Sequence, residues 1–160
     1  VRYFKFLNQT SKDLSLNLKI LITSCEEMSK SKMGAIIVLR KNNSLDFTLN
    51  ENNYSKIQLT PQVLESIFFK NSPLHDGAIV IENNFITATR VVLPVSDLSN
   101  IPSRYGLRHR AALGITEKTD ALVLVISEQT GKVAYFKNGG FFNFDSFKDL
   151  EKTISQDLSD

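Results

Sequence analysis

Residues 35–39 read Ala-Ile-Ile-Val-Leu, an unbroken apolar run rich in β-branched side chains. Such a run is typical of a central strand that is buried on both faces of its sheet. A second run of the same kind extends from Ala121 to Ile126. Together the two runs predict the middle of a β-sheet.

Hairpins extend this sheet on either side. Ala78 to Glu82 and Phe85 to Leu93 are predicted strands joined by Asn83-Asn84, a dipeptide that can adopt the positive φ angles of a tight turn. The strand that ends at Ile126 is expected to pair with Lys132 to Phe136 across a turn at Gly131. The polar stretch from Arg40 to Asn53 is expected to be a loop with a short edge strand near Phe47.

Four segments have helical character. From Asp13 to Lys32, apolar residues recur at steps of three and four, which predicts an amphipathic helix ending near Gly34. Cys25 lies on that apolar stripe, so we expect it to be buried rather than reactive. The other predicted helices start at Thr60-Pro61, span Ser103 to Thr116 with Ser103 as the N-cap, and span Asp145 to Leu158. The order of elements predicts an α/β fold, a single domain over residues 1–160 with a mixed, twisted sheet flanked by helices on both sides.

Composition narrows the possible functions. With 160 residues, 42% of them hydrophobic, the chain is long enough for one ordinary core. The net charge is only +2, from 19 basic and 17 acidic residues, which disfavours nucleic acid as a partner. A single cysteine rules out an internal disulfide framework and points to a reducing, cytoplasmic location. Apolar runs are too short to span a membrane, and a chain that opens at Val1 is expected to be processed or cut from a longer protein.

Two short motifs carry the chemistry. One is His75-Asp76-Gly77-Ala78, and the other is Arg108-His109-Arg110. A carboxylate can hold a divalent metal or accept a proton from a hydroxyl, and a guanidinium group grips phosphate oxygens with two hydrogen bonds. A carboxylate and a guanidinium group, each near a glycine that lets a ligand approach the backbone, are typical of sites that bind nucleotides and act on their phosphates.

Each motif also has a purely structural interpretation. Asp-Gly is the commonest dipeptide of hairpin turns, so the first motif could be a plain turn. However, Asp76 follows a helix break and leads into a buried strand, where a carboxylate is costly unless it meets water, a metal or a cation. Three consecutive basic residues on a helix diverge by about 100° per residue, so at most two of them can face one phosphate group. His109 could be a core histidine, and Ser127, at the end of a buried strand, could be structural.

Taken together, several segments resemble the catalytic domain of diadenylate cyclases. The resemblance covers about Leu14 to Phe136, and its hallmarks are Asp76-Gly77-Ala78 and Arg108-His109-Arg110 in that order. The segments that carry it are MGAIIVL, LTPQVLESIFFKNSPLHDGAIVI, LPVS and RHRAALGITEKTDALVLVISEQTG. Within that family, the likeness is greatest to the branch whose cyclase domain is tethered to the membrane by N-terminal helices.

The resemblance implies a reaction in which two ATP molecules condense into cyclic di-AMP and two pyrophosphates, between two face-to-face copies of the domain that meet transiently. It implies Mn²⁺ or Mg²⁺, with Co²⁺ as another option, held by His75 and Asp76. Its implied catalytic residues are Asp76, Arg108, His109 and Arg110. Its implied nucleotide-binding residues are Gly77, Ala78, Val92, Leu93, Leu107, Arg108, Ser127 and Gln129.

Three positions depart from the family pattern. Val92 stands where many relatives place a tyrosine that stacks on adenine, Leu107 replaces a threonine, and Gln129 replaces an acidic residue. Two other functions compete with the cyclase interpretation. One is a nucleotide-binding sensor with a degraded site, which Asp76 disfavours because a carboxylate near phosphate needs a metal. The other is a DNA-binding helix at residues 103–116, which the balanced charge disfavours.

Overall fold

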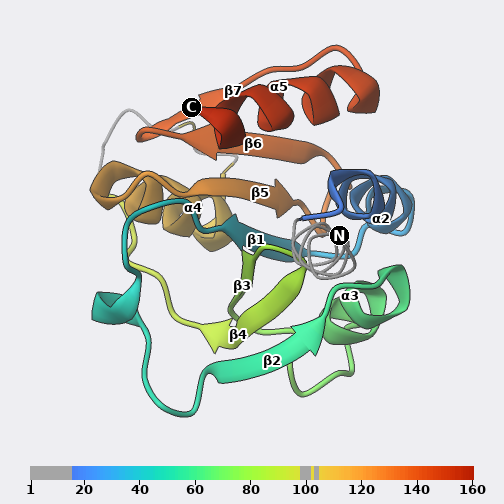
Figure 1. Cartoon of the computed structure of the whole chain (residues 1–160). Helices are drawn as coiled ribbons and strands as arrows, with labels where there is room; N and C mark the ends of the chain where they lie inside the picture. The colour runs from blue at the N-terminus through green and yellow to red at the C-terminus, as the bar shows by residue number, and fades with distance from the viewer. Residues whose placement is uncertain (1–15, 98–101, 103–104) are drawn as a thin grey trace, which may run out of the picture.

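The computed structural model describes residues 16–97, 102 and 105–160. Its centre is a seven-stranded sheet in the order β2-β4-β3-β1-β5-β6-β7 (Figure 1). The strands are β1 (Ala35–Leu39), β2 (Tyr54–Gln58), β3 (Ala78–Glu82), β4 (Phe85–Val91), β5 (Leu122–Ile126), β6 (Val133–Lys137) and β7 (Gly140–Phe142). Only β1 and β3 pair in parallel, and the other neighbours are antiparallel. The predicted mixed sheet is therefore confirmed.

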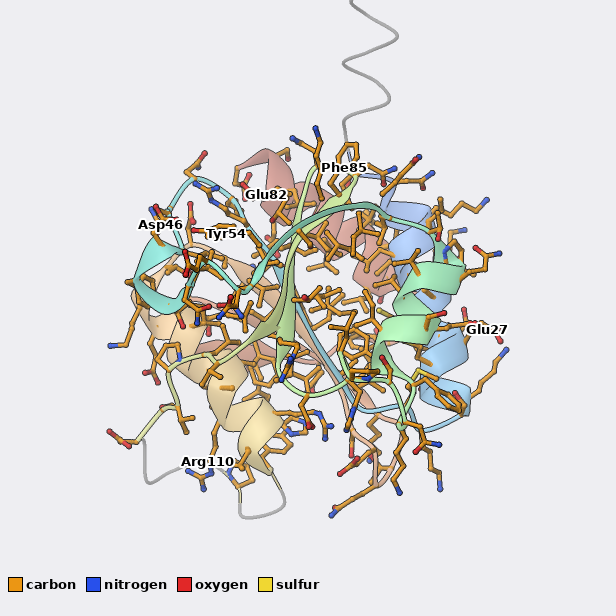
Figure 2. The ribbon with its side chains drawn as sticks, turned by 90° about the horizontal axis from the view of Figure 1, so that it is seen from below. Glu27, Asp46, Tyr54, Glu82, Phe85 and Arg110 are labelled. Carbon is orange, nitrogen blue, oxygen red and sulfur yellow. The ribbon has the colours of Figure 1, made fainter. Side chains whose placement is uncertain are left out.

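Helices cover both faces of the sheet, as predicted (Figure 2). One face packs against α2 (Leu18–Lys30), α3 (Pro61–Phe68) and α5 (Phe147–Ser159), and the other packs against α4 (Leu107–Lys118). The strand β1 divides its side chains between two cores. Ala35, Ile37 and Leu39 enter the core with α2, whereas Ile36 and Val38 enter the core with α4. This alternation explains why the run at residues 35–39 is apolar at every position.

The helix ends follow local chemistry. The side chains of Asn17, Thr60 and Ser146 accept backbone N–H bonds at the starts of α2, α3 and α5. Cys25 is fully buried in α2, and burial raises the pKa of its thiol to about 12. This confirms that Cys25 is a packing residue.

Several predicted boundaries are wrong. The segment near Phe47 is a short 3₁₀ helix, η1 (Asp46–Thr48), and the edge strand is β2, which begins at Tyr54. The strand β7 was not predicted at all. Both edge strands are short and partly exposed, so they lack the apolar run that marks a central strand.

The helix α4 begins at Leu107, with Gly106 as its N-cap, rather than at Ser103. Ser103 itself lies outside the described residues, as do residues 13–15 of the first predicted helix. The strand β4 ends at Val91 rather than at Leu93, one residue after Arg90, which has a φ of 54°. That angle accompanies a bulge in β4, after which Val91 pairs with Ala78 as the last residue of the strand.

Candidate functional site

A cleft of about 730 Å³ opens at one end of the sheet. The strands β1 and β3 begin at this end, and their antiparallel neighbours β4 and β5 finish there. Segments far apart in the sequence therefore meet beside the start of α4. The cleft is lined by Ile36, Asp76, Gly77, Val91, Val92, Leu93, Val95, Gly106, Leu107, Arg108, His109, Ala111, Ser127, Glu128 and Gln129.

A second hollow of about 440 Å³ adjoins the cleft. The two share Asp76, Arg108 and Glu128, and the second hollow adds His75 together with Lys32 and Lys70. The pair of hollows thus combines a largely apolar compartment with a compartment that contains several cations. Such a combination suits a ligand with an apolar ring at one end and phosphates at the other.

Three of the predicted site residues do not line the cleft. Ala78 is fully buried and pairs with Val91 inside the sheet, so its side chain does not reach the cavity. Arg110 lies at the rim of the molecule, and its backbone carbonyl accepts the N–H of Ser96 at 3.0 Å (Figure 2). His75 lines the adjoining hollow only.

The Asp76-Gly77 dipeptide leads into β3 and does not form a hairpin turn. Gly77 has a φ of 88°, and a Cβ atom there would lie 2.8 Å from the backbone carbon of Arg90. Both the angle and the close approach require glycine. The resulting bend leaves the Asp76 side chain 83% exposed at the cleft.

His75 is oriented by the backbone. Its Nδ1 lies 2.7 Å from the carbonyl oxygen of Ser72, which can only accept, so Nδ1 carries the proton. The other nitrogen, Nε2, lies 3.2 Å from Oδ1 of Asp76. In the neutral ring these two atoms both have lone pairs, and a proton or a cation between them removes the repulsion. A ring whose Nδ1–H is held by a carbonyl is the usual arrangement of a metal-ligating histidine, so the pair fits a divalent cation.

Arg108 is held between two neighbours. Its Nη1 lies 3.5 Å from Oε1 of Glu128, and its side chain is 27% exposed. The guanidinium group also packs on Gly34, where an added Cβ would lie 2.8 Å from Cζ of Arg108. Glu128 and Gly34 thereby direct this cation toward both hollows.

His109 forms part of an aromatic wall. Its ring stacks on Tyr105 with centroids 4.5 Å apart, and its edge contacts Phe136. Burial, and secondly the neighbouring Arg108, lower the pKa of His109 below its ordinary value. The ring is therefore neutral at pH 7. His109 packs against aromatic neighbours, as expected of a core histidine, and also lines the cleft.

The start of α4 contributes backbone donors. Gly106 provides no side-chain cap, so the first amides of the helix are available to an anion. The rest of α4 is packed tightly, since a Cβ on Gly114 would lie 1.8 Å from the carbonyl oxygen of Pro94. Residues 111–116 are all buried, which disfavours the alternative in which this helix enters a DNA groove.

Ser127 closes the turn after β5. Its Oγ accepts the N–H groups of Gln129 and Thr130, both at 3.2 Å. These bonds use the lone pairs of the hydroxyl and leave its proton able to donate to a ligand. Ser127 thus has a structural role, and its donor remains available at the cleft.

Some residues of this site were not predicted. The sequence indicates Gly34 and Lys32 only as the end and the basic last turn of a helix and Glu128 only as the end of a strand, and it indicates no role for Lys70. Lys32 has a positive φ of 53°, and the sequence gives no sign of this angle.

The sequence and the fold match a family of nucleotide-binding domains. Residues 22–141 match the DAC family, described as "DisA bacterial checkpoint controller nucleotide-binding". The chain belongs to this family.

Individual relatives agree. The chain is similar to "Diadenylate cyclase CdaS" of Bacillus thuringiensis, with 40% identity over 119 residues, which is 74% of this chain and 59% of that protein. It is similar in structure to DacA from Staphylococcus aureus, crystallised as a double mutant, with a TM-score of 0.84, 30% identity, and coverage of 94% of this chain and 98% of that one.

A crystal structure of a "hypothetical membrane spanning protein" from Bacillus cereus is also similar, with a TM-score of 0.78, 36% identity, and coverage of 82% of this chain and 65% of that one. The chain spans between half and three fifths of the length of the first curated relatives that it matches. Within the described part of the chain, none of the helices has the length and apolar character needed to cross a bilayer.

Proposed function

We propose that this chain is the catalytic domain of a diadenylate cyclase, which condenses two ATP molecules into cyclic di-AMP and two pyrophosphates. The observation that carries the proposal is the position of Asp76 and Arg108 on the shared boundary of the cleft and the cationic hollow. This arrangement puts a carboxylate and a phosphate-binding cation in reach of one nucleotide. Relatives whose names state the same activity support it.

In the proposed reaction, the 3′-hydroxyl of each ATP attacks the α-phosphorus of the other. A 3′-O–P bond forms, the α–β phosphoanhydride bond breaks, and pyrophosphate leaves with its electron pair. Asp76 lies beside the 3′-hydroxyl and accepts or directs its proton. Arg108 and the first amides of α4 hold the triphosphate, and the Ser127 hydroxyl donates to a phosphate oxygen. The backbone at Leu93 reads the edge of the adenine.

His75 and Asp76 are the residues that would hold a divalent cation, Mn²⁺ or Mg²⁺, with Co²⁺ as another option. Such an ion neutralises charge on the phosphates and lowers the pKa of a bound hydroxyl. The orientation of the His75 ring by Ser72 supports this role, because it aims Nε2 at the Asp76 carboxylate.

The reaction requires two copies of the domain, because one cleft presents one ATP and each ATP must meet a second. Beside the cleft, Val92 is 81% exposed and Leu107 is 75% exposed, and Val95 is exposed as well. Apolar side chains at the mouth of a cleft suit a face that a second protomer covers transiently. The rate per molecule should then rise with protein concentration, and excess Asp76→Asn protein should inhibit the wild type.

The parent protein is proposed to be anchored in the membrane through a further N-terminal segment, with this domain in the cytoplasm. The name of the structural relative from Bacillus cereus supports this placement.

The direct test is to incubate the protein with ATP and Mn²⁺ or Mg²⁺ and to detect cyclic di-AMP by mass spectrometry. The expected result is metal-dependent cyclic di-AMP with two pyrophosphates per product. Binding of ATP without any product at high protein concentration would support the alternative of a nucleotide sensor. The Asp76→Asn variant is the control for contaminating cyclase activity.

A further inference from the structure

Asn53 is a buried polar residue that lies outside the cleft, directly before β2. The residue is only 7% exposed. Its Nδ2 donates to the carbonyl oxygens of Thr89 at 3.0 Å and Arg90 at 3.2 Å. Its Oδ1 accepts the N–H of Asn50 at 2.9 Å. The backbone carbonyl of Asn53 also accepts the N–H of Thr89 at 2.9 Å. One side chain therefore ties the loop before β2 to the end of β4.

The two carbonyls that accept from Asn53 belong to the peptide groups on either side of the Arg90 Cα atom. Together they restrain the φ and ψ angles of Arg90. Arg90 has a φ of 54°, which is unfavourable for a residue with a Cβ atom, and the pairing of β3 with β4 shifts register between Ala78 and Val80. Asn53 thus stabilises a bulge that the sequence of β4 does not favour by itself.

This bulge touches the Asp76-Gly77 bend. A Cβ atom on Gly77 would lie 2.8 Å from the carbonyl carbon of Arg90 and 3.0 Å from the carbonyl oxygen of Val91. The chain that leaves Arg90 continues directly into Val92 and so to the cleft. The conformation of Arg90 therefore fixes two parts of the cleft at once. One is the Asp76-Gly77 bend, which Arg90 contacts, and the other is the segment from Val92, which follows it in the chain.

We infer that Asn53 is a positioning residue for the cleft: its carboxamide holds the bend at Arg90 and thereby sets Asp76 relative to the Val92–Leu93 segment. It acts on the ligand only through these neighbours, because it does not line the cleft. The effect of Asn53 on catalysis rests on the proposed function, whereas its effect on the backbone does not.

The test compares Asn53→Ala with the double variant Asn53→Ala/Arg90→Gly. Asn53→Ala should shift the NMR amide resonances of Gly77 and Val92 and lower kcat/KM for cyclic di-AMP formation by about tenfold, because Asp76 and the Val92–Leu93 segment are no longer held in register for one nucleotide. Glycine adopts a positive φ without steric cost, so Arg90→Gly should return the resonances toward their wild-type positions and restore most of kcat/KM. A purely structural loss at Asn53 would not be rescued at residue 90.

Two controls frame the result. Asn52→Ala makes the same chemical change at the exposed neighbour and should leave the Gly77 resonance and kcat/KM unchanged. Arg90→Gly alone is the reference for the double variant: adding Asn53→Ala to it should change the Gly77 resonance and kcat/KM much less than adding Asn53→Ala to the wild type does. If Asn53→Ala does not fold, the inference requires that the double variant folds.

Unchanged Gly77 and Val92 resonances in folded Asn53→Ala, or a double variant as impaired as the single one, would overturn the inference. If the wild type makes no cyclic di-AMP, the proposed function fails, but the resonance comparison still decides the role of Asn53.

Discussion

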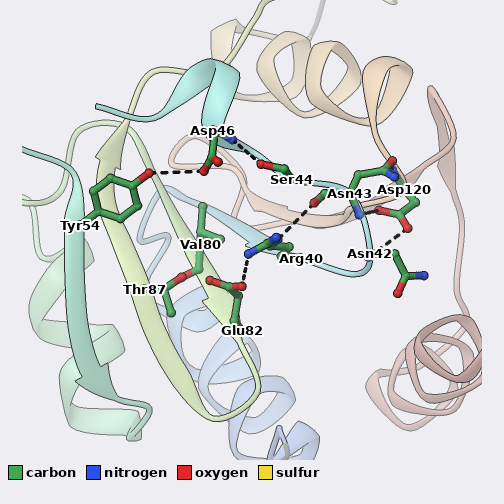
Figure 3. Close-up of polar contacts among 10 residues, drawn as sticks. All are labelled: Arg40, Asn42, Asn43, Ser44, Asp46, Tyr54, Val80, Glu82, Thr87 and Asp120. Atoms are coloured by element: carbon green, nitrogen blue, oxygen red, sulfur yellow. Dashed lines mark hydrogen bonds and ion pairs between the residues drawn. The ribbon is translucent and has the colours of Figure 1, made fainter. Parts of the chain in front are cut away.

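The two ends of the sheet use their charged side chains in different ways. At the end away from the cleft, Arg40 pairs with Glu82 and donates to the carbonyl of Asn43, while Asp120 accepts the backbone N–H groups of Asn42 and Asn43 (Figure 3). Hydrogen bonds from these backbone amides and the nearby Lys41 outweigh desolvation and lower the pKa of Asp120. The charges at this end are engaged in holding loops together.

At the cleft end, the corresponding groups keep unused bonding capacity. Asp76 is 83% exposed, its contact with His75 lacks a proton in the neutral ring, and Arg108 meets Glu128 only at 3.5 Å. A charged group whose hydrogen bonds and ion pairs are all made within the protein stabilises the fold, whereas a charged group that lacks some of these partners can bind a ligand. The difference between the two ends is therefore what marks the site, and each prediction below tests part of it.

The largest effect is expected from exchanging a carboxylate for an amide at each end. Asp76→Asn should reduce cyclic di-AMP formation by about a hundredfold to ten-thousandfold, because it removes the group that accepts the proton or holds the cation, while ATP binding and Tm persist. Asp120→Asn should keep the activity but lower Tm by roughly 2–4 °C, because its amide nitrogen would face a backbone donor. Turnover assays and thermal melts of the two variants test whether Asp76→Asn lowers activity but not Tm, and Asp120→Asn lowers Tm but not activity. Near-native turnover of Asp76→Asn would remove Asp76 from the mechanism.

The second test compares two arginines of one helix. Arg108→Ala should weaken ATP binding by about tenfold to a hundredfold, the range expected for one or two lost charge-assisted hydrogen bonds. Arg110→Ala should have a much smaller effect, because Arg110 does not line the cleft. Titration calorimetry with ATP measures both. Equal affinities in wild type and both variants would show that the triphosphate lies elsewhere.

These two motifs could be located from sequence because their positions depend on local patterns. A buried run such as residues 121–126 identifies a central strand, and the residues that precede one strand or follow its antiparallel neighbour must share an end of the sheet. Asn53 and Gly34 could not be assigned in the same way. Their roles come from contacts with Arg90 and Arg108, which are distant in sequence, and no local pattern reports them.

The third prediction concerns the base. Val92 is 81% exposed at the cleft, and its carbonyl is fixed by the Thr48 hydroxyl, so a larger side chain has room there. Val92→Tyr should lower KM for ATP by roughly tenfold, because a stacked base gains on the order of 1–3 kcal/mol. Tyr105, the other aromatic residue close to this site in sequence, packs on His109 and lines a neighbouring groove that shares His109, Ser127 and Gln129 with the cleft.

Steady-state kinetics of Val92→Tyr test this directly, and Val95→Tyr is the matched control at the same rim. An unchanged or higher KM in Val92→Tyr would mean that the adenine is covered in another way.

The fourth prediction tests how the cleft cation is held. Gly34→Ala places a methyl group 2.8 Å from Cζ of Arg108, and the flexible guanidinium must move away. KM for ATP should rise about threefold to fivefold, with Tm nearly unchanged, because the loss is less than that of removing Arg108 altogether. Gly140→Ala is the control, since its new methyl group would meet atoms no closer than 3.8 Å. A KM equal to that of the wild type would show that Gly34 does not position Arg108.

The smallest effect concerns His109, which stands on the cleft wall but is used for packing. Burial, and secondly Arg108, lower its pKa in the folded state, so near and below its ordinary pKa of about 6.5 the unfolded chain binds more protons than the folded one. The contribution of the neutral ring to stability is therefore complete above that pH and is lost as the pH falls through the lowered pKa. His109→Phe keeps an aromatic ring against Tyr105 but cannot titrate. Its Tm should fall less than that of the wild type between pH 7.5 and pH 5, and the difference between the two curves isolates His109, because every other side chain is the same in both proteins. Parallel curves would show that His109 is protonated equally in the folded and unfolded states, and would place it with the charged groups of the site rather than with the core.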